Sequence, residues 1–364
     1  MRINREHYKN LKQLPERDLI TPGSPLCAGC GGLTTLRLVL KMLGGNVLIV
    51  NAAGCMTLLA VHPHTPLHCS WLYTTMASPS AGAQGVRDAL DIRLAKGKRL
   101  ADADRCGQAD RCGQADRCGQ GGLEAEENLD VLVLAGDGST CDMGLSSTSA
   151  AIHRGLDFWY LCYDNEAYGN TGFQSSSSSP LGSSTATEPG GVLRRKKDIF
   201  EIWRVQRPPY IATISSHDPL DLAEKIYRGR KFHGPKLLVA LAVCPTGWGF
   251  DPQQGDRIAG LAIETGVWPL KEAFQGVVRH TLIPQTLRAV EEYLRPQRRF
   301  RHLFLPRHQT EVLRAIQAQV DGYWRTVRRE ENTTNYRSPS GRMPDPKLDA
   351  TRSPIAGRDE TLGP

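Results

Sequence analysis

Four cysteines in this sequence have the surroundings of metal ligands. Cys27 and Cys30 form a C-x-x-C pair with glycine on both sides of Cys30, which lets two sulfurs reach one metal centre. Cys55 follows a glycine in a turn, and Cys244 precedes a proline that stiffens its loop. Four thiolates suit either a [4Fe–4S] cluster or structural zinc, and the C-x-x-C pair alone also fits a redox dithiol. Coordination chemistry leaves these alternatives open.

A second group of residues has the character of a magnesium and diphosphate site. The Gly-Asp-Gly of Gly136–Gly138 follows an apolar run and precedes a helix-like segment, where the backbone can approach a phosphate closely. Asp137 offers a carboxylate oxygen, while Asn165 and the Ala167 carbonyl offer two more in the turn after the next apolar run. Gly-Asp-Gly alone is often only a tight turn. The second turn at this distance favours a ligand site.

The elements that must position these residues alternate between strand and helix. Buried strands are predicted at 46–50, 130–135, 158–163 and 237–243, with helices at 33–43 and 143–153. Continuous apolar strands of this kind are typical of an α/β fold, a mostly parallel sheet covered by helices on both faces. Ligands of such sheets collect beyond the carboxyl ends of the strands. Each motif except the Cys27/Cys30 pair follows a strand, so we expect one shared site.

Composition divides the chain into segments. We predict an N-terminal arm at 1–25, a main domain at 26–252, a C-terminal arm of helices at 253–329 and a disordered tail at 330–364. Residues 103–120 are three perfect copies of Ala-Asp-Arg-Cys-Gly-Gln. Because perfect copies indicate a tandem expansion where length is tolerated, we predict a disordered surface insertion at 96–128.

Charge and hydropathy exclude several classes of protein. The 364 residues are 40% hydrophobic, and the net charge of +7 is spread unevenly, with arginines clustered at 295–307 and 325–329. No nucleic-acid motif accompanies these basic residues, which suit CoA phosphates or an acidic electron carrier instead. No signal peptide or apolar run of ~20 residues is visible, so we expect a cytoplasmic chain without a membrane span. In that compartment, ten cysteines indicate metal sites and buried thiols rather than disulfides.

The motifs together resemble one enzyme family. Gly-Asp-Gly with an Asn-rich turn is similar to the thiamine diphosphate signature. The sequence of residues 164–172, Asp-Asn-Glu-Ala-Tyr-Gly-Asn-Thr-Gly, resembles that of the β chain of pyruvate:ferredoxin oxidoreductase and its 2-oxoacid relatives. The segments around Cys27–Cys30, Cys55 and Cys244–Trp248 resemble the ligands of that chain's [4Fe–4S] cluster. The likeness covers roughly residues 15–325, although Met76–Ser80 stands where a phenylalanine- and asparagine-containing stretch is expected.

The resemblance implies a thiamine diphosphate-binding fold and assigns its site residues. The implied cofactor-binding residues are Gly136, Asp137, Gly138, Asn165, Ala167, Tyr168, Asn170 and Thr171. The implied Mg²⁺ ligands are Asp137, Asn165 and the Ala167 carbonyl. The implied [4Fe–4S] ligands are Cys27, Cys30, Cys55 and Cys244. Asn170 is the implied catalytic residue, because its amide would lie near the reactive thiazolium carbon and stabilise charge there.

The resemblance also implies a reaction and partners. The reaction is oxidative decarboxylation of pyruvate to acetyl-CoA and CO₂, with electrons passed through the cluster to ferredoxin. The sequence contains strands for only one sheet, so we expect the pyrimidine-binding domain on a separate α subunit. It also lacks the cysteine pattern of a two-cluster ferredoxin, so we expect electrons to leave through a ferredoxin-like subunit. A γ subunit is expected as well. The alternatives are another 2-oxoacid (2-oxoisovalerate, 2-oxoglutarate or indolepyruvate), a non-redox thiamine decarboxylase with structural zinc, and a non-catalytic subunit.

Overall fold

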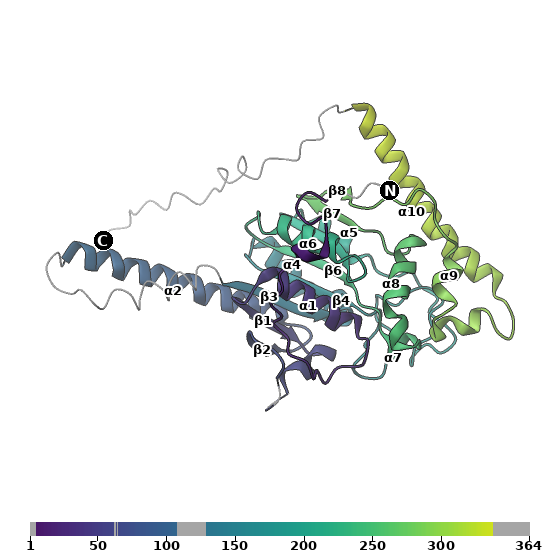
Figure 1. Cartoon of the computed structure of the whole chain (residues 1–364), viewed down its shortest axis with the longest axis horizontal. Coiled ribbons are helices and arrows are strands. Elements are labelled where there is room, and N and C mark those ends of the chain that lie inside the picture. The colour runs from purple at the N-terminus through teal and green to yellow at the C-terminus, as the bar shows by residue number, and fades with distance from the viewer. Residues whose placement is uncertain (1–4, 62, 64, 108–128, 338–364) are drawn as a thin grey trace, which may run out of the picture. The chain divides into compact units, whose positions relative to one another are not determined.

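The computed structural model describes residues 5–61, 63, 65–107 and 129–337, and it divides into two compact units (Figure 1). The first unit spans Met1–Val320 and contains the whole sheet. The second unit spans Asp321–Pro364, and its described part is the end of the last helix. All predicted site residues belong to the first unit.

Eight strands of the described residues form one sheet in the order β2–β1–β3–β4–β6–β5–β7–β8. The pairs from β2 to β5 along this order are parallel, while β5–β7 and β7–β8 are antiparallel. The strands are β1 (Val47–Ala52), β2 (Ser70–Thr74), β3 (Asp130–Gly136), β4 (Trp159–Asp164), β5 (Tyr210–Ser215), β6 (Lys236–Leu241), β7 (Lys271–Phe274) and β8 (Val277–His280). This topology confirms the predicted mostly parallel α/β sheet.

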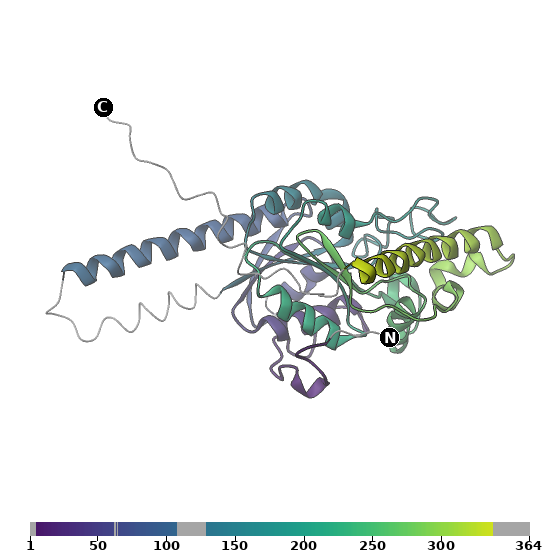
Figure 2. The same cartoon turned by 90° about the horizontal axis from the view of Figure 1, so that it is seen from above.

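Helices cover both faces of the sheet (Figures 1 and 2). The α-helices are α1 (Gly31–Leu43), α2 (Pro79–Gly107), α4 (Leu145–His153), α5 (Ile199–Arg204), α6 (Pro219–Gly229), α7 (Pro245–Trp248), α8 (Gly255–Glu264), α9 (Val290–Leu294) and α10 (Thr310–Arg337). Short 3-10 helices lie at η1 (Leu11–Gln13), η2 (Cys55–Ala60), η4 (Pro252–Gln254) and η5 (Arg298–Leu303), and η3 (Gly138–Met143) is a π-helix. No helix of the described part of the chain is long and apolar enough to cross a bilayer.

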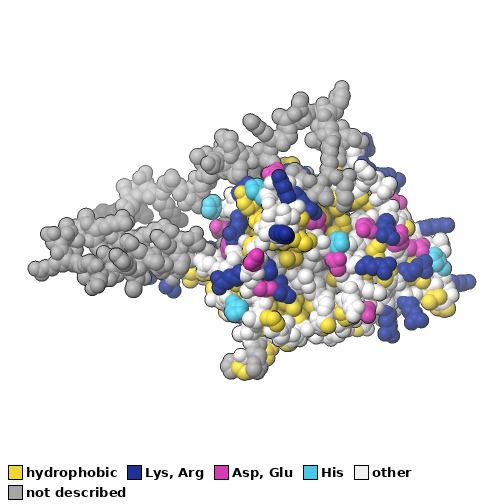
Figure 3. Space-filling view, viewed as in Figure 1, with side chains coloured by type: hydrophobic (Ala, Val, Ile, Leu, Met, Phe, Trp, Pro, Cys, Tyr) yellow, Lys and Arg dark blue, Asp and Glu magenta, His cyan; other side chains and the backbone are white. Residues whose placement is uncertain are grey.

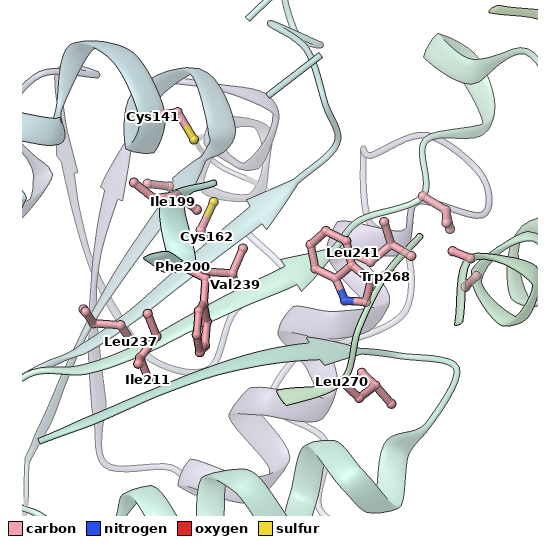
Figure 4. Packing of buried hydrophobic residues seen from close by; sticks show 14 of the residues in the cluster. Cys141, Cys162, Ile199, Phe200, Ile211, Leu237, Val239, Leu241, Trp268 and Leu270 are labelled. Atoms are coloured by element: carbon pink, nitrogen blue, oxygen red, sulfur yellow. The ribbon is translucent and has the colours of Figure 1, made fainter. Parts of the chain in front are cut away.

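Successive residues of the central strands point to opposite faces, and each face has its own core. On β4, Tyr160 and Cys162 pack with α4 and α5, and Figure 4 shows Cys162 in that core beside Cys141, Ile199 and Phe200. Trp159 and Tyr163 face the other core, which α1 and α6 complete. Burial of both faces explains why these strands are continuous apolar runs rather than alternating ones.

The structure differs from the sequence predictions in several elements. Strands β2 and β5 were not predicted. The 253–329 segment contains strands β7 and β8 in addition to helices. These strands gave no apolar signal because Lys271 and Glu272 are buried as ion pairs, Lys271 with Glu201 and Glu272 with Arg228. Helix α2 continues into the 96–128 insertion as far as Gly107, and helix α10 continues into the predicted tail as far as Arg337. The rest of the insertion, 108–128, and the rest of the tail, 338–364, lie outside the described residues.

Basic side chains of the C-terminal third lie among acidic ones. Arg288 pairs with Glu264 and Glu292, and Arg295 pairs with Glu291. On the face drawn in Figure 3, lysine and arginine side chains are likewise interspersed with aspartate and glutamate. The basic side chains drawn on this face therefore do not form one unbroken patch.

Candidate active site

A cleft opens where β1, β3 and β4 end. All eight predicted cofactor-binding residues line it: Gly136, Asp137, Gly138, Asn165, Ala167, Tyr168, Asn170 and Thr171. Asn170 and Thr171 are exposed at the cleft, whereas Asp137 and Asn165 are buried. The structure therefore brings the two predicted turns together at one edge of the sheet.

The two glycines of Gly136–Gly138 make room for aromatic rings from the neighbouring strand and turn. A Cβ on Gly138 would lie 2.2 Å from the Tyr168 ring, and one on Gly136 would lie 3.1 Å from the Tyr163 ring. The Tyr168 hydroxyl then donates to Asp142 at 2.9 Å, which fixes the ring. Only glycine fits at position 138 without displacing Tyr168. Glycine is therefore required here for packing, as well as for close approach of the backbone to a phosphate.

Three oxygen-bearing groups converge beside the cleft. Asp137 is fully buried, and its Oδ2 accepts a hydrogen bond from the Ser176 hydroxyl at 2.5 Å. One end of the Asn165 amide lies 2.9 Å from Asp137 Oδ1 and 2.7 Å from the Ala167 carbonyl oxygen. With its nitrogen at that end, the amide donates to both oxygens. With its oxygen there, all three groups are free to bind one cation.

The separations of these oxygens fit a magnesium ion. Octahedral coordination with bonds of about 2.0–2.1 Å places neighbouring ligand oxygens about 2.9 Å apart. Burial and the nearby Asp164 raise the pKa of Asp137 well above its usual value. A cation at this point would oppose that shift and favour the ionised carboxylate. The oxygen donor set and its spacing thus suit a hard divalent cation.

Charged residues around Glu166 brace the turn that carries Asn165 and Ala167. Glu166 has a positive φ of 65°, an uncommon conformation for a residue with a side chain. Its carboxylate pairs with Lys196 at 2.8 Å and with Arg299 at 2.6 Å. Although burial opposes ionisation, these two cations lower the pKa of Glu166. Lys196 also pairs with Asp164 at 2.6 Å, so the turn is fixed before any ligand binds.

The four cysteines gather around the start of helix α1. Gly31 N–H donates to the Val243 carbonyl at 3.0 Å, so Cys30 and Cys244 each adjoin one end of this bond. A Cβ on Gly31 would lie 2.7 Å from the Val243 nitrogen, and glycine therefore permits the approach. Cys27 joins the group through its carbonyl, which accepts from Cys30 N–H at 3.2 Å.

Cys55 belongs to both parts of the site. It begins η2 directly after β1, and it lines the cleft together with Asp137 and Asn165. Its sulfur lies 3.4 Å from the position that a Cβ on Gly169 would occupy, in the turn between Tyr168 and Asn170. The cysteine group and the cleft therefore share a wall.

Electrostatics and spacing describe the kind of metal site that these cysteines suit. Burial and the other three cysteines raise the pKa of Cys55 to about 12, and burial raises the pKa of Cys30 and Cys244. Among the described residues, only Glu6, His7 and Glu224 place three ligand atoms within 4.8 Å of one another. The four thiols are thus close enough to influence one another electrostatically, but no three of their sulfurs lie within 4.8 Å of one another.

Sequence reasoning missed several residues of the cleft and its support. The additional lining residues are Ala53, Gly54, Met76, Ser139, Tyr163 and Gly169. Met76 belongs to the stretch that departs from the family pattern, and its carbonyl accepts from the Ser139 hydroxyl at 2.5 Å. Glycines next to the predicted ligands were the available signal for Gly54 and Gly169. Ser176 gave no signal, because it lies in a run of five serines.

Comparison with known proteins places this site in a class. Residues 119–240 match the family described as thiamine pyrophosphate enzyme, C-terminal TPP binding domain. The match includes the Gly-Asp-Gly strand–helix turn and the Asn165 turn. The chain therefore contains a thiamine diphosphate-binding domain.

Relatives over nearly the full chain narrow the class to a family. Pyruvate synthase subunit PorB of Methanothermobacter marburgensis is 38% identical, covering 87% of this chain and 99% of the relative. PorB of Thermotoga maritima is 31% identical over 89% and 97%, and ketoisovalerate oxidoreductase subunit VorB of Pyrococcus horikoshii is 32% identical over the same shares. The chain belongs to the family of PorB-type β subunits of thiamine diphosphate-dependent 2-oxoacid:ferredoxin oxidoreductases.

A solved structure supports the fold. 2-Oxoglutarate:ferredoxin oxidoreductase from Magnetococcus marinus aligns with a TM-score of 0.50 at 16% identity, covering 86% of this chain and 99% of that chain. At this identity the likeness shows the fold alone. Together with the family match, it confirms the predicted thiamine diphosphate-binding fold and the predicted enzyme family.

Proposed function

We propose that this chain is the catalytic β subunit of a pyruvate:ferredoxin oxidoreductase, which oxidises pyruvate to acetyl-CoA and CO₂. The observation that carries the proposal is the position of Cys55 on the wall of the cleft that holds Asp137 and Asn165. A cofactor in this cleft and a redox cluster at the cysteines would adjoin each other. Such proximity is what electron transfer from the cofactor requires. Relatives named pyruvate synthase subunit PorB support pyruvate as the substrate.

Thiamine diphosphate supplies the carbon chemistry when bound, and we assign its anchoring to the two turns. Asp137, Asn165 and the Ala167 carbonyl would hold Mg²⁺, which bridges the cofactor to the protein. The backbone of Gly136–Gly138 would cradle the diphosphate. Asn170 is exposed at the cleft, so its amide is available to a bound ligand, where it would stabilise developing charge.

We assign a [4Fe–4S] cluster rather than structural zinc to Cys27, Cys30, Cys55 and Cys244. Tetrahedral zinc with Zn–S bonds of about 2.3 Å places its sulfurs about 3.8 Å apart. No three of these four sulfurs lie within 4.8 Å of one another, so no such zinc geometry is preformed. The position of Cys55 on the wall of the cleft supports a redox centre rather than a structural ion.

The complete enzyme requires other chains in this proposal. The strands of the described residues form one sheet. A pyrimidine-binding domain on an α subunit would complete the cofactor site, and a ferredoxin-like subunit would carry electrons onward to ferredoxin. A γ subunit completes the assembly, and a cytoplasmic location remains a prediction.

Substrate specificity can be tested on the complex purified anaerobically with its natural partners. Ferredoxin reduction would be measured with CoA and each of four substrates: pyruvate, 2-oxoisovalerate, 2-oxoglutarate and indolepyruvate. We expect the highest kcat/KM for pyruvate. A preference for another substrate would move the assignment to that 2-oxoacid, and decarboxylation without ferredoxin reduction by a zinc-containing complex would overturn the redox proposal. Turnover by this chain alone would contradict the need for an α subunit.

A further inference from the structure

A buried arginine connects the cysteine site with the Asn165 turn. The Arg299 side chain is 1% exposed, and its guanidinium carbon lies 3.8 Å from the centre of the Trp248 ring. Trp248 ends helix α7, which begins directly after Cys244, and its backbone N–H donates to the Cys244 carbonyl at 2.8 Å. The Trp248 indole N–H donates to the Asn165 carbonyl at 2.9 Å. Arg299 thus lies against a residue whose backbone contacts the cysteine site and whose side chain contacts the Asn165 turn.

The guanidinium is held in place from several directions. Its Nη2 lies 2.6 Å from the Glu166 carboxylate, and its Nε donates to Gln297 Oε1 at 2.8 Å. The Arg299 carbonyl accepts from Ser184 N–H at 2.8 Å, which anchors the backbone. An arginine packed in this way has a fixed position and keeps its positive charge.

Arg299 stacks on Trp248, which lies one helical turn after Cys244, and solvent hardly reaches the guanidinium. A buried charge at this position is only weakly screened from the cysteine site. Gly247 N–H points at the Cys244 sulfur, at 3.3 Å. Net charge and hydrogen bonds near the sulfurs are two of the factors that set the potential of an iron–sulfur cluster. A cation favours the reduced form, since reduction adds one negative charge.

We propose that Arg299 is a positioning residue that raises the reduction potential of the cluster bound at the cysteine site, with Glu166 moderating its charge. This inference rests on the proposed cluster. It assigns to Arg299 a role that differs from ligand binding, because no part of its side chain belongs to either ligand set. Arg299 thereby makes the cluster a better electron acceptor for the adjacent cofactor site.

The test is an anaerobic redox titration of the purified complex, with the reduced-cluster EPR signal as the readout. Arg299→Gln should lower the midpoint potential, whereas Arg299→Lys retains a positive charge and should keep most of the wild-type value. Arg298→Gln is the matched control, because this neighbouring side chain is exposed and its charge is screened by solvent. Glu166→Gln should shift the potential upward, opposite to Arg299→Gln.

Opposite shifts distinguish an electrostatic role from a merely structural one. Loss of packing would disturb both variants without reversing the sign. If Arg299→Gln fails to fold, the midpoint potentials of Glu166→Gln and Arg299→Lys still test whether the charge of Arg299 acts on the cluster. Unchanged or downward potentials in Glu166→Gln, or a wild-type potential in Arg299→Gln, would overturn the inference. An absent cluster signal in the wild-type complex would instead refute the proposed function.

Discussion

The Asn165 turn and the cysteine site lie against each other at one edge of the sheet, yet they are held by different forces. The turn is fixed by side chains, since ion pairs to Lys196 and Arg299 hold Glu166, and Ser176 holds Asp137. The cysteines are placed by backbone contacts such as the bond from Gly31 to Val243, and Cys27 is exposed. The comparison shows that the Asn165 turn is preorganised, and we propose that the cysteine site gains its remaining order when it binds its metal.

Removal of one thiol is the most direct test of the proposed cluster at the cysteine site. Cys55→Ala should abolish the iron–sulfur signal, because the cluster loses one of its four ligands, while thiamine diphosphate binding persists. Iron content and EPR after dithionite reduction would be measured on the same sample. Cys69→Ala is the control, since Cys69 is a half-buried thiol outside the group. An intact signal in Cys55→Ala would exclude Cys55 from the ligand set.

The converse experiment removes a ligand from the proposed magnesium and diphosphate site. Asp137→Ala should weaken magnesium-dependent thiamine diphosphate binding by at least about 100-fold, because the cation loses its carboxylate ligand. Calorimetry of the binding would measure this, and the iron content should be unchanged. Asp157→Ala, which removes a partner of Lys236 at the opposite end of the strands, should bind normally. Equal binding by Asp137→Ala and wild type would refute the magnesium assignment.

A smaller change sharpens the claim that side chains preorganise the turn. Ser176→Ala removes the hydroxyl that donates to Asp137 Oδ2, and thiamine diphosphate binding should weaken by about 10-fold. Ser183→Ala removes a comparable hydroxyl bond, to the Pro180 carbonyl, and should not alter binding. Similar affinities of the two variants in calorimetry would show that the turn does not depend on this bond.

The smallest effect concerns the contact between the two halves. Trp248→Phe leaves the Asn165 carbonyl without the indole donor and should reduce the free energy of unfolding by about 1 kcal/mol, with a few-fold weaker cofactor binding. Trp159→Phe removes a similar bond, to Asp130, at the other end of β4, so it should reduce stability alone. Denaturant unfolding and calorimetry would be compared for both variants. Weaker binding in both would contradict a specific role for Trp248.

The sequence was sufficient for four strands whose burial is nearly complete and apolar, although the equally buried β5 was missed. The strands that end at Gly136 and Asp164 were predicted for that reason, and the glycines beside them marked the turns. Strands β7 and β8 were missed, because ion pairs of Lys271 and Glu272 are set by distant residues. The same reason hid Arg299, whose burial depends on Glu166 and Trp248, far away in the chain. Contacts of this kind have no local pattern.

The most direct test of the account is low-temperature EPR on the complex, purified anaerobically with its partners and mixed with pyruvate, with and without CoA. The account predicts a reduced-cluster signal that depends on pyruvate and forms faster with CoA, because the cofactor cleft and the cysteine site share the wall at Cys55. A dithionite-reducible cluster that stays oxidised with every 2-oxoacid would contradict electron transfer between the two sites. A complex that contains zinc and gives no cluster signal would contradict the redox assignment itself.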